Sequence, residues 1–213
     1  MAASLDLDHI RLGARPLLVC DIDEVVLEFI TPFRDFLRSR GVDLLPRSFR
    51  LHGNIVLTAD GSPIAHADVS DLIEDFFGCQ DLWQKPAEMA VETLHALSEQ
   101  LDIIFLTAMP PRHEALRRAM LDRFDLRFPL IATEDAKGPV VDRLHDRRAL
   151  PVIFLDDMVR NHLSVRDHVP DCLLVSLMAN ADFRALAPPL TETIRDAAGW
   201  DEAHAIIRDH CRL

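Results

Sequence analysis

The chain has 213 residues, of which 49% are hydrophobic and 27% are charged, and this balance excludes a globally disordered protein. Its formal net charge is −12 and its pI is near 5.2. We do not expect a nucleic-acid partner, because phosphate binding needs clustered Lys and Arg and the sequence has no such cluster.

The sequence is that expected of a cytoplasmic protein with reduced thiols. The four cysteines are scattered without a Cys-x-x-Cys spacing, so neither a zinc knuckle nor a disulfide framework is indicated. The N-terminal sequence MAASLDLDHIRLG has early acids and no apolar h-region, and no stretch approaches about 18 uninterrupted apolar residues. Secretion, membrane spanning and a membrane partner are therefore not expected, while the oligomeric state is left open.

The first apolar run, PLLVC at residues 16–20, is followed by two aspartates, Asp21 and Asp23, one residue apart. Residues two apart on a strand point the same way, so both carboxylates are expected on one side. An acid at the end of a buried strand has lost much of its water. A compensating charge or ligand is therefore expected beside it.

The next segment, residues 24–85, is too long for a simple crossover between two core strands. Thr31-Pro32 predicts the N-cap and first residue of a helix that ends at Gly41. Apolar and polar residues alternate around Asp60-Gly61, which predicts a hairpin. We expect segment 24–85 to be a small helix-and-hairpin cap insertion packed over one edge of the sheet.

Four further apolar runs resemble the first in length and in their content of Val, Ile and Leu, as parallel strands covered on both faces do. They are residues 101–107, 128–133, 151–156 and 172–177. Helical patterns lie between them, at residues 86–100, 111–124 and 139–148. This alternation predicts an α/β fold, a Rossmann-like three-layer sandwich with a parallel sheet. Its core domain would comprise residues 1–23 and 86–213.

Three of the helical patterns make specific predictions. Pro86 is expected in the first turn of the helix at 86–100. The sequence WDEAHAIIRDHCRL at the C-terminus predicts an amphipathic helix that packs on the core or on a second subunit. The helix at 111–124 is expected to present an apolar stripe made of Ala115, Leu116, Ala119, Met120 and Phe124.

Polar side chains end three of the predicted core strands. They are Asp21 and Asp23 after the first strand, Thr107 at the end of the second, and Asp156 and Asp157 after the fourth. In a doubly wound sheet the C-terminal ends of the strands line the ligand crevice, so these residues are expected to converge. Lys137 lies just before a helix that leads into the fourth strand, and we expect it on the same rim.

The gathered charges indicate a metal ion. Two carboxylates about 4 Å apart repel each other by about 4 kcal/mol at an effective dielectric of about 20, so four of them need compensation from a divalent cation and an ammonium group. Oxygen-only ligands favour Mg²⁺ over zinc or a calcium cage. A carboxylate nucleophile, a second acid, a hydroxyl and a lysine are the groups that phosphoryl transfer through an aspartyl-phosphate requires.

These motifs resemble those of the haloacid dehalogenase (HAD) superfamily in their order. LLVCDIDEVVL resembles the first motif, IIFLTAMP the second, and VIFLDDM the acidic fourth, with Lys137 in the place of the third-motif lysine. The resemblance covers residues 16–178 and leaves room for a cap between the first two motifs. Leu155 precedes the fourth-motif acids where a glycine is common, and Met109-Pro110 follows the second motif, which leaves the substrate pocket unassigned.

The resemblance implies a Mg²⁺-dependent phosphatase that hydrolyses a small phosphorylated metabolite. Asp21 would be the nucleophile, Asp23 the general acid and base, and Thr107 and Lys137 the groups that hold the phosphoryl oxygens. The metal ligands would be Asp21, the backbone carbonyl of Asp23, Asp156 and Asp157, the last directly or through water. Dehalogenases usually lack the second aspartate of the first motif, so Asp23 argues for phosphate chemistry.

Simpler roles stay open for several of these residues. Lys137 could be a solvated lysine beside Glu134 and Asp135, and Thr107 could cap a helix that begins at Pro110 or Pro111. Asn161, one helical turn beyond Asp157, could brace the metal site or be an ordinary polar helix residue.

Other polar residues have weaker signals. His52, His66 and His162 share no ligand spacing, so a histidine metal site is not expected. Four further residues could touch substrate, but we expect them to be exposed at the surface or packed within the cap. They are Arg112, Arg160, His52 and Asn54.

Two rival functions use the same residues. A receiver-type phospho-switch has its acidic pair first and its phosphorylated aspartate on a middle strand, so the order found here disfavours it. A HAD-like scaffold that binds a partner without turnover is the second alternative, and the intact set of acid, hydroxyl and lysine argues against it.

Overall fold

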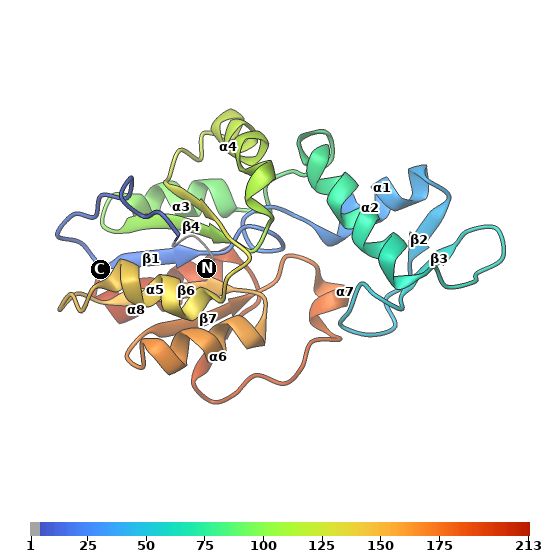
Figure 1. Ribbon diagram of the computed structural model, residues 1–213. Coiled ribbons are helices and arrows are strands. Elements are labelled where there is room, and N and C mark those ends of the chain that lie inside the picture. The colour runs from blue at the N-terminus through green and yellow to red at the C-terminus, as the bar shows by residue number, and fades with distance from the viewer. Residues whose placement is uncertain (1–4) are drawn as a thin grey trace.

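The computed structural model describes residues 5–213, and these form a six-stranded sheet with the order β5-β4-β1-β6-β7-β8 (Figure 1). Residues 1–4 of the predicted core domain lie outside the described residues. Every pair of neighbouring strands in this sheet is parallel. The strands are β1 (Leu17–Cys20), β4 (Asp102–Thr107), β5 (Leu130–Ala132), β6 (Val152–Asp156), β7 (Leu173–Leu177) and β8 (Ile194–Ala197). The five predicted strands and the parallel α/β sheet are confirmed.

The sheet is the middle layer of three. Alternate residues of β1 point to opposite faces, so Leu18 and Cys20 join one hydrophobic cluster and Leu17 and Val19 join another. Helices α3 and α8 contribute to the first cluster, and α5 and α6 contribute to the second. The predicted three-layer sandwich is therefore confirmed.

Helices form at the three predicted places between the core strands, but α3 and α4 begin later than predicted and α5 begins two residues earlier. They are α3 (Ala90–Ser98), α4 (Glu114–Arg123), α5 (Lys137–His145), α6 (Val159–His168), α7 (Ala181–Arg184) and α8 (Trp200–Cys211). The prediction that Pro86 opens the helix at 86–100 is wrong. Pro86 forms an antiparallel bridge with Leu27, and Ala87 N–H donates to the Val26 carbonyl at 2.9 Å. Across residues 5–213, no helix has the length and apolar character needed to cross a membrane.

The C-terminal part adds an edge strand that the sequence analysis missed. β8 pairs in parallel with β7, although Arg195 and Asp196 at its centre are polar and exposed. Helix α8 follows and packs on the core: Ala203 and Ile207 are buried there, and Trp200 Nε1 donates to the Val25 carbonyl at 3.0 Å. Of the two alternatives for this helix, the structure shows packing on the core.

Segment 24–85 forms a group of elements beyond one end of the sheet (Figure 1). They are α1 (Ile30–Ser39), β2 (Val42–Leu44), β3 (Ile55–Leu57), α2 (His66–Gly78) and a 3₁₀ turn at Gln80–Leu82. Phe33 and Phe76 lie at the centre of a separate aromatic cluster, with ring centroids 5.2 Å apart. Val25, Val26 and Leu27 belong instead to the cluster on the sheet. The division at residue 24 stays a prediction.

The turn at Asp60-Gly61 reverses the chain, but the regular partner of β3 comes from elsewhere. Leu57 N–H donates to the Ser62 carbonyl at 2.8 Å, and Val56 forms a single bridge with Pro63. Pro63 has no N–H to donate, and the next residue, Ile64, donates its N–H to the Ile55 carbonyl at 3.2 Å, so only a short, irregular pairing forms on this side of β3. β3 instead pairs antiparallel with β2, so the predicted hairpin is right in its turn and incomplete in its pairing.

Helix α1 begins without the predicted Thr31 cap. Its first N–H groups are satisfied by Glu24, whose Oε1 accepts from Phe29 N at 2.8 Å and from Ile30 N at 2.6 Å. The other carboxylate oxygen, Oε2, accepts from Asn180 N at 2.8 Å. Glu24 is 3% exposed and has a φ of 66°, so it links the end of β1, the start of α1 and the loop after β7.

We predict that Glu24→Ala lowers the free energy of unfolding by about 3 kcal/mol, because buried N–H groups would lose their acceptor. Chemical denaturation followed by circular dichroism measures the change. Glu28→Ala is the matched control, since the Glu28 side chain makes an exposed contact of 3.3 Å with Lys85. A loss no larger than that of the control would contradict the assigned role of Glu24.

Candidate active site

The C-terminal ends of three adjacent strands bring the predicted polar residues together. β1 lies between β4 and β6 with Cys20 opposite Phe105 and Leu155, so Asp21, Thr107 and Asp156 end neighbouring strands. The chain turns from one side of β1 to the other at this point, and such a switch point opens a crevice beyond the strand ends.

Lys137 is the first residue of α5, and its ammonium group lies between two buried carboxylates. The Nζ atom donates to Asp21 Oδ1 at 2.6 Å and to Asp156 Oδ2 at 2.7 Å. Lys137 is 2% exposed, so the alternative of a solvated lysine beside Glu134 and Asp135 is wrong. Lys137 is buried because α5 packs closely against α6. At Gly138 the two helices are so near that an added Cβ would lie 2.2 Å from the Ser164 carbonyl oxygen.

Burial and crowding of like charges disfavour ionised acids at this site. Burial raises the pKa of Asp21 to about 7, although the Lys137 ammonium opposes the effect and Asp156 adds to it. The pKa of Asp157 is also raised well above its ordinary value, by burial first and by Asp156 and Asp21 next. A cation near these groups would favour the charged forms.

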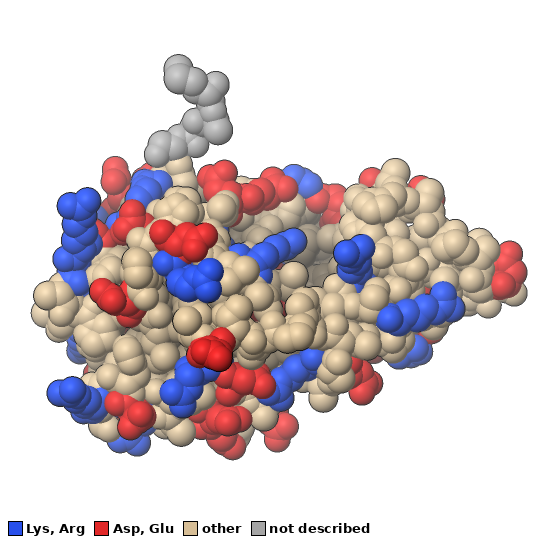
Figure 2. All heavy atoms as spheres, turned by 90° about the horizontal axis from the view of Figure 1, so that it is seen from below, with Lys and Arg blue, Asp and Glu red and all other residues tan. Residues whose placement is uncertain are grey.

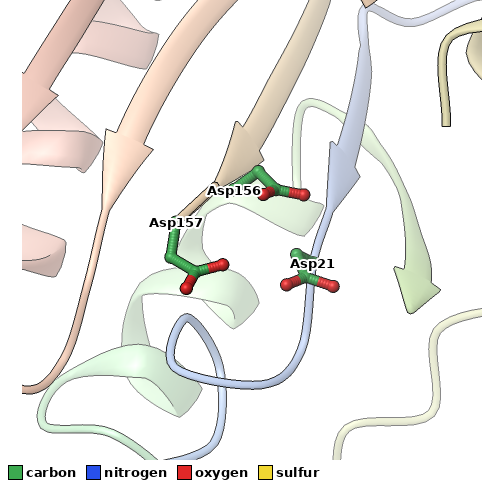
Figure 3. Close-up of side chains that lie close together, drawn as sticks. All are labelled: Asp21, Asp156 and Asp157. Atoms are coloured by element: carbon green, nitrogen blue, oxygen red, sulfur yellow. The ribbon is translucent and has the colours of Figure 1, made fainter. Parts of the chain in front are cut away.

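Asp21, Asp156 and Asp157 can offer oxygen atoms that lie within 4.8 Å of one another. Figure 3 shows the three carboxylates at the ends of β1 and β6. Asp156 is held in place by Asn161, whose Nδ2 donates to both carboxylate oxygens at 3.0 and 3.1 Å, and by Met158 N at 2.8 Å. A set of hard oxygen donors fits Mg²⁺ in its chemistry. Of the two alternatives for Asn161, the structure shows the bracing contact.

Asp23 lies apart from this group and has cationic and amide partners of its own. Arg117 Nη2 donates to its Oδ1 at 2.9 Å, and Gln84 Nε2 donates to the same oxygen at 2.8 Å. Thr107 Oγ1 lies 3.4 Å from Asp23 Oδ2, and it also accepts from Met109 N at 3.3 Å. Asp23 is therefore on the Thr107 side of the site and Asp156 on the Lys137 side.

Arg117 is the site residue that the sequence analysis missed. The predicted stripe of α4 included Ala115 and Ala119, but both are exposed, whereas Arg117 is fully buried. Met120 and Leu121, three and four residues later, are buried on the same face. The sequence did carry a signal for Arg117, since it lies three and four residues before the apolar Met120 and Leu121. A positive charge on the apolar face of a helix indicates an acidic partner inside the protein.

A cavity of about 720 Å³ opens between the strand ends and segment 24–85. Figure 2 shows a hollow between the two parts of the molecule, with Lys and Arg side chains near its rim. Asp21, Asp23 and Asp157 line the cavity. Side chains from both parts of the molecule complete the lining, and they include Phe29, Phe49, Arg50, His52, His66, Ile73, Phe77, Met109, Met158, Arg160, Met178 and Phe183.

The remaining candidates have separate positions. The rings of His52 and His66 stack with centroids 3.8 Å apart at the cavity, while His162 is buried beneath the site with Nε2 3.0 Å from the Asp156 carbonyl oxygen. They do not form a metal trio. Arg112 pairs with Glu74 at the surface, and Asn54 Nδ2 donates to the carbonyls of Ser48 and Arg50. Arg160 and His52 line the cavity, whereas Arg112 and Asn54 do not.

Comparisons with known proteins agree on the fold. No family model and no curated protein sequence matches the chain. A haloacid dehalogenase-like family hydrolase from Streptococcus pneumoniae superposes with a TM-score of 0.58 at 12% identity, over 91% of this chain and 98% of that chain. The chain has the fold of the HAD-like hydrolases. The fold implied by the resemblance of the motifs is therefore confirmed.

Two further solved structures share this HAD-like fold. A HAD family hydrolase from Deinococcus radiodurans, with phosphate and sodium bound, has a TM-score of 0.57 at 14% identity, over 92% of this chain and 96% of that chain. The protein tyrosine kinase A of Mycobacterium tuberculosis has a TM-score of 0.57 at 19% identity, over 94% of this chain and 100% of that chain. At these identities the likeness establishes the fold.

We predict that Lys137→Met lowers the free energy of unfolding by about 3–5 kcal/mol in the presence of a chelator, because two buried carboxylates lose their cation. Added Mg²⁺ should restore part of the loss by binding the folded state, and thermal unfolding with and without Mg²⁺ measures both effects. Lys85→Met, at an exposed lysine, is the control and should change neither value. A Lys137→Met protein as stable as this control would refute the role given to the ammonium.

Proposed function

We propose that the chain is a Mg²⁺-dependent hydrolase of a small phosphomonoester in the HAD superfamily. The observation on which this depends is the placement of the Asp21 carboxylate at the cavity, in contact with the Lys137 ammonium and within reach of Asp156 and Asp157. The carboxylate proposed as nucleophile, the ammonium proposed to bind phosphoryl oxygens and the proposed metal ligands thus lie close together. The phosphate bound in the Deinococcus hydrolase of the same fold supports this reading.

In the first step, a carboxylate oxygen of Asp21 attacks the phosphorus atom of the ester. The P–O bond to the leaving group breaks as the new O–P bond forms, and Asp23 donates a proton to the departing oxygen so that a neutral alcohol leaves. Lys137 Nζ and Thr107 Oγ1 would bind the phosphoryl oxygens. The product of this step is an aspartyl-phosphate on Asp21.

In the second step, the Asp23 carboxylate takes a proton from a water molecule as that water attacks phosphorus. The bond between Asp21 and phosphorus breaks, which releases inorganic phosphate and restores both aspartates to their starting states. Over the two steps one ester and one water give one alcohol and one phosphate.

Asp21, Asp156 and Asp157 would hold the Mg²⁺, with the Asp23 carbonyl as a further ligand implied by the resemblance. When bound, the ion neutralises charge on the phosphoryl oxygens. The chain's own contribution is to keep Asp156 oriented through Asn161 and Met158 N.

The walls of the cavity favour a substrate with a largely apolar body. Phe29, Phe49 and Phe77 line it, together with Met109 and Ile73. A buried apolar wall adds binding energy for a hydrocarbon or ring and none for a sugar hydroxyl left without a partner. A volume of about 720 Å³ also suits a small metabolite. We therefore propose a small phosphorylated metabolite with an apolar or aromatic body.

A scaffold without turnover is the second candidate, and it is favoured by one observation. Asp23 is engaged by Arg117 and Gln84, so its proton-transfer role requires one of its oxygens to stay accessible. A scaffold would bind phosphate esters without releasing phosphate, so the two candidates differ in a simple assay.

We predict that the wild type releases inorganic phosphate from aryl phosphates with Mg²⁺ and stops when the metal is chelated. Asp21→Asn should lower kcat by at least about 10³-fold, because the attacking carboxylate is gone. Asp122→Asn, at an exposed aspartate of α4, is the control and should retain the wild-type rate. If the wild type were no faster than Asp21→Asn, the scaffold would be the better account.

A further inference from the structure

Arg117 is a fully buried cation outside the group formed by Asp21, Lys137 and Asp156. Its guanidinium contacts Asp23 through Nη1 at 3.2 Å and through Nη2 at 2.9 and 3.2 Å. Its Nε donates to Gln80 Oε1, and Nη2 also donates to Gln84 Oε1 at 3.2 Å. A buried guanidinium is costly unless it is paired, and here its paired acid is the one proposed to transfer protons.

The two oxygens of Asp23 have different surroundings. Oδ1 is held by the shorter contacts, from Gln84 Nε2 at 2.8 Å and Arg117 Nη2 at 2.9 Å. Oδ2 has longer contacts, 3.2 Å to each of two Arg117 nitrogens and 3.4 Å to Thr107 Oγ1. Oδ1 is therefore the anchored oxygen, and Oδ2 faces the hydroxyl expected to bind the phosphoryl group.

We propose that Arg117, assisted by Gln84, is a positioning residue that anchors Asp23 by Oδ1 so that Oδ2 exchanges the proton with the leaving group and with water. This inference rests on the proposed hydrolase function. No covalent bond to Arg117 is made or broken. Its effect is to fix the direction from which Asp23 gives the proton to the leaving oxygen and later takes one from water.

The choice of arginine follows from geometry. A guanidinium presents several donors in a planar fork, which can hold a carboxylate and two amide oxygens at once, whereas an ammonium is a single point of charge on a flexible chain. Gln80 and Gln84 accept from Nε and Nη2, and Gln80 is itself fixed by donating to the Phe77 carbonyl at 2.8 Å. A purely structural tie between α4 and the 3₁₀ turn would require the Gln80 contact alone.

The test is the dependence of the rate on the leaving group. An ester with a good leaving group, such as 4-nitrophenyl phosphate, needs little protonation in its first step, whereas an alkyl phosphate needs the proton from Asp23. We expect Arg117→Met to lower kcat/KM for an alkyl phosphate by about 10²-fold and for 4-nitrophenyl phosphate by less than about 5-fold. Asp23→Asn should show the same pattern, and combining it with Arg117→Met should add little further loss.

Two comparisons separate positioning from support of the fold. Arg118→Met removes the neighbouring arginine, which donates to the carbonyls of Leu126 and Phe128, and should leave the leaving-group dependence unchanged. Arg117→Lys keeps the charge and loses the fork, so it should recover part of the stability but little of the alkyl phosphate rate.

Gln84→Leu removes the other anchor of Oδ1 and gives an independent reading if Arg117→Met does not fold. It should show the same selective loss, by about 10-fold on the alkyl phosphate. Two outcomes would overturn the positioning role and leave the hydrolase proposal standing. One is that kcat/KM of the folded variants falls equally for all esters. The other is that the rate losses of Arg117→Met and Asp23→Asn multiply in the double variant. A wild type that hydrolyses none of the esters would overturn both.

Discussion

The Lys137 ammonium between Asp21 and Asp156 is the contact on which the rest of the site depends. Two nearly dehydrated carboxylates at the ends of adjacent strands would repel each other, and the ammonium lies 2.6 and 2.7 Å from their oxygens. Its position requires α5 to begin at the strand ends, which in turn requires α5 and α6 to touch at Gly138. Helix packing on one face of the sheet therefore determines the charge balance of the crevice.

Much of the core and the convergence of the polar strand ends were predictable from local sequence. Runs such as 151–156 are apolar on both faces, so they predict buried parallel strands, and a polar residue at the end of each run predicts convergence at the crevice. β8 was missed because a short edge strand needs no apolar centre, as Arg195 shows. A bracing role for Asn161 at the acidic site was one of two predicted alternatives, because Asn161 lies one helical turn beyond Asp157, and the acid that it contacts is Asp156.

Contacts between distant segments were not predictable in the same way. The predicted stripe of α4 does not include Arg117, because its partners Asp23 and Gln84 lie 94 and 33 residues away in the chain. Glu24 was likewise passed over as a helix cap, since the cap of α1 came from the turn after β1 rather than from Thr31. In both cases a side chain forms hydrogen bonds with a polar group inside the protein. The periodicity of the local sequence does not indicate which group that is.

The two acids of the first motif, two residues apart, end in different electrostatic surroundings. Asp21 faces an ammonium and two further carboxylates, which is the environment of a nucleophile beside a metal ion. Asp23 faces a planar guanidinium, an amide and a hydroxyl, which hold a carboxylate in a fixed orientation without supplying a second acid. Pairs of titratable groups placed in unlike environments are how one site divides nucleophilic and proton-transfer work. The positive φ of Glu24, directly after Asp23, shows where the chain bends as it leaves these two environments. The division of labour proposed for Asp21 and Asp23 thus depends on how the backbone leaves β1.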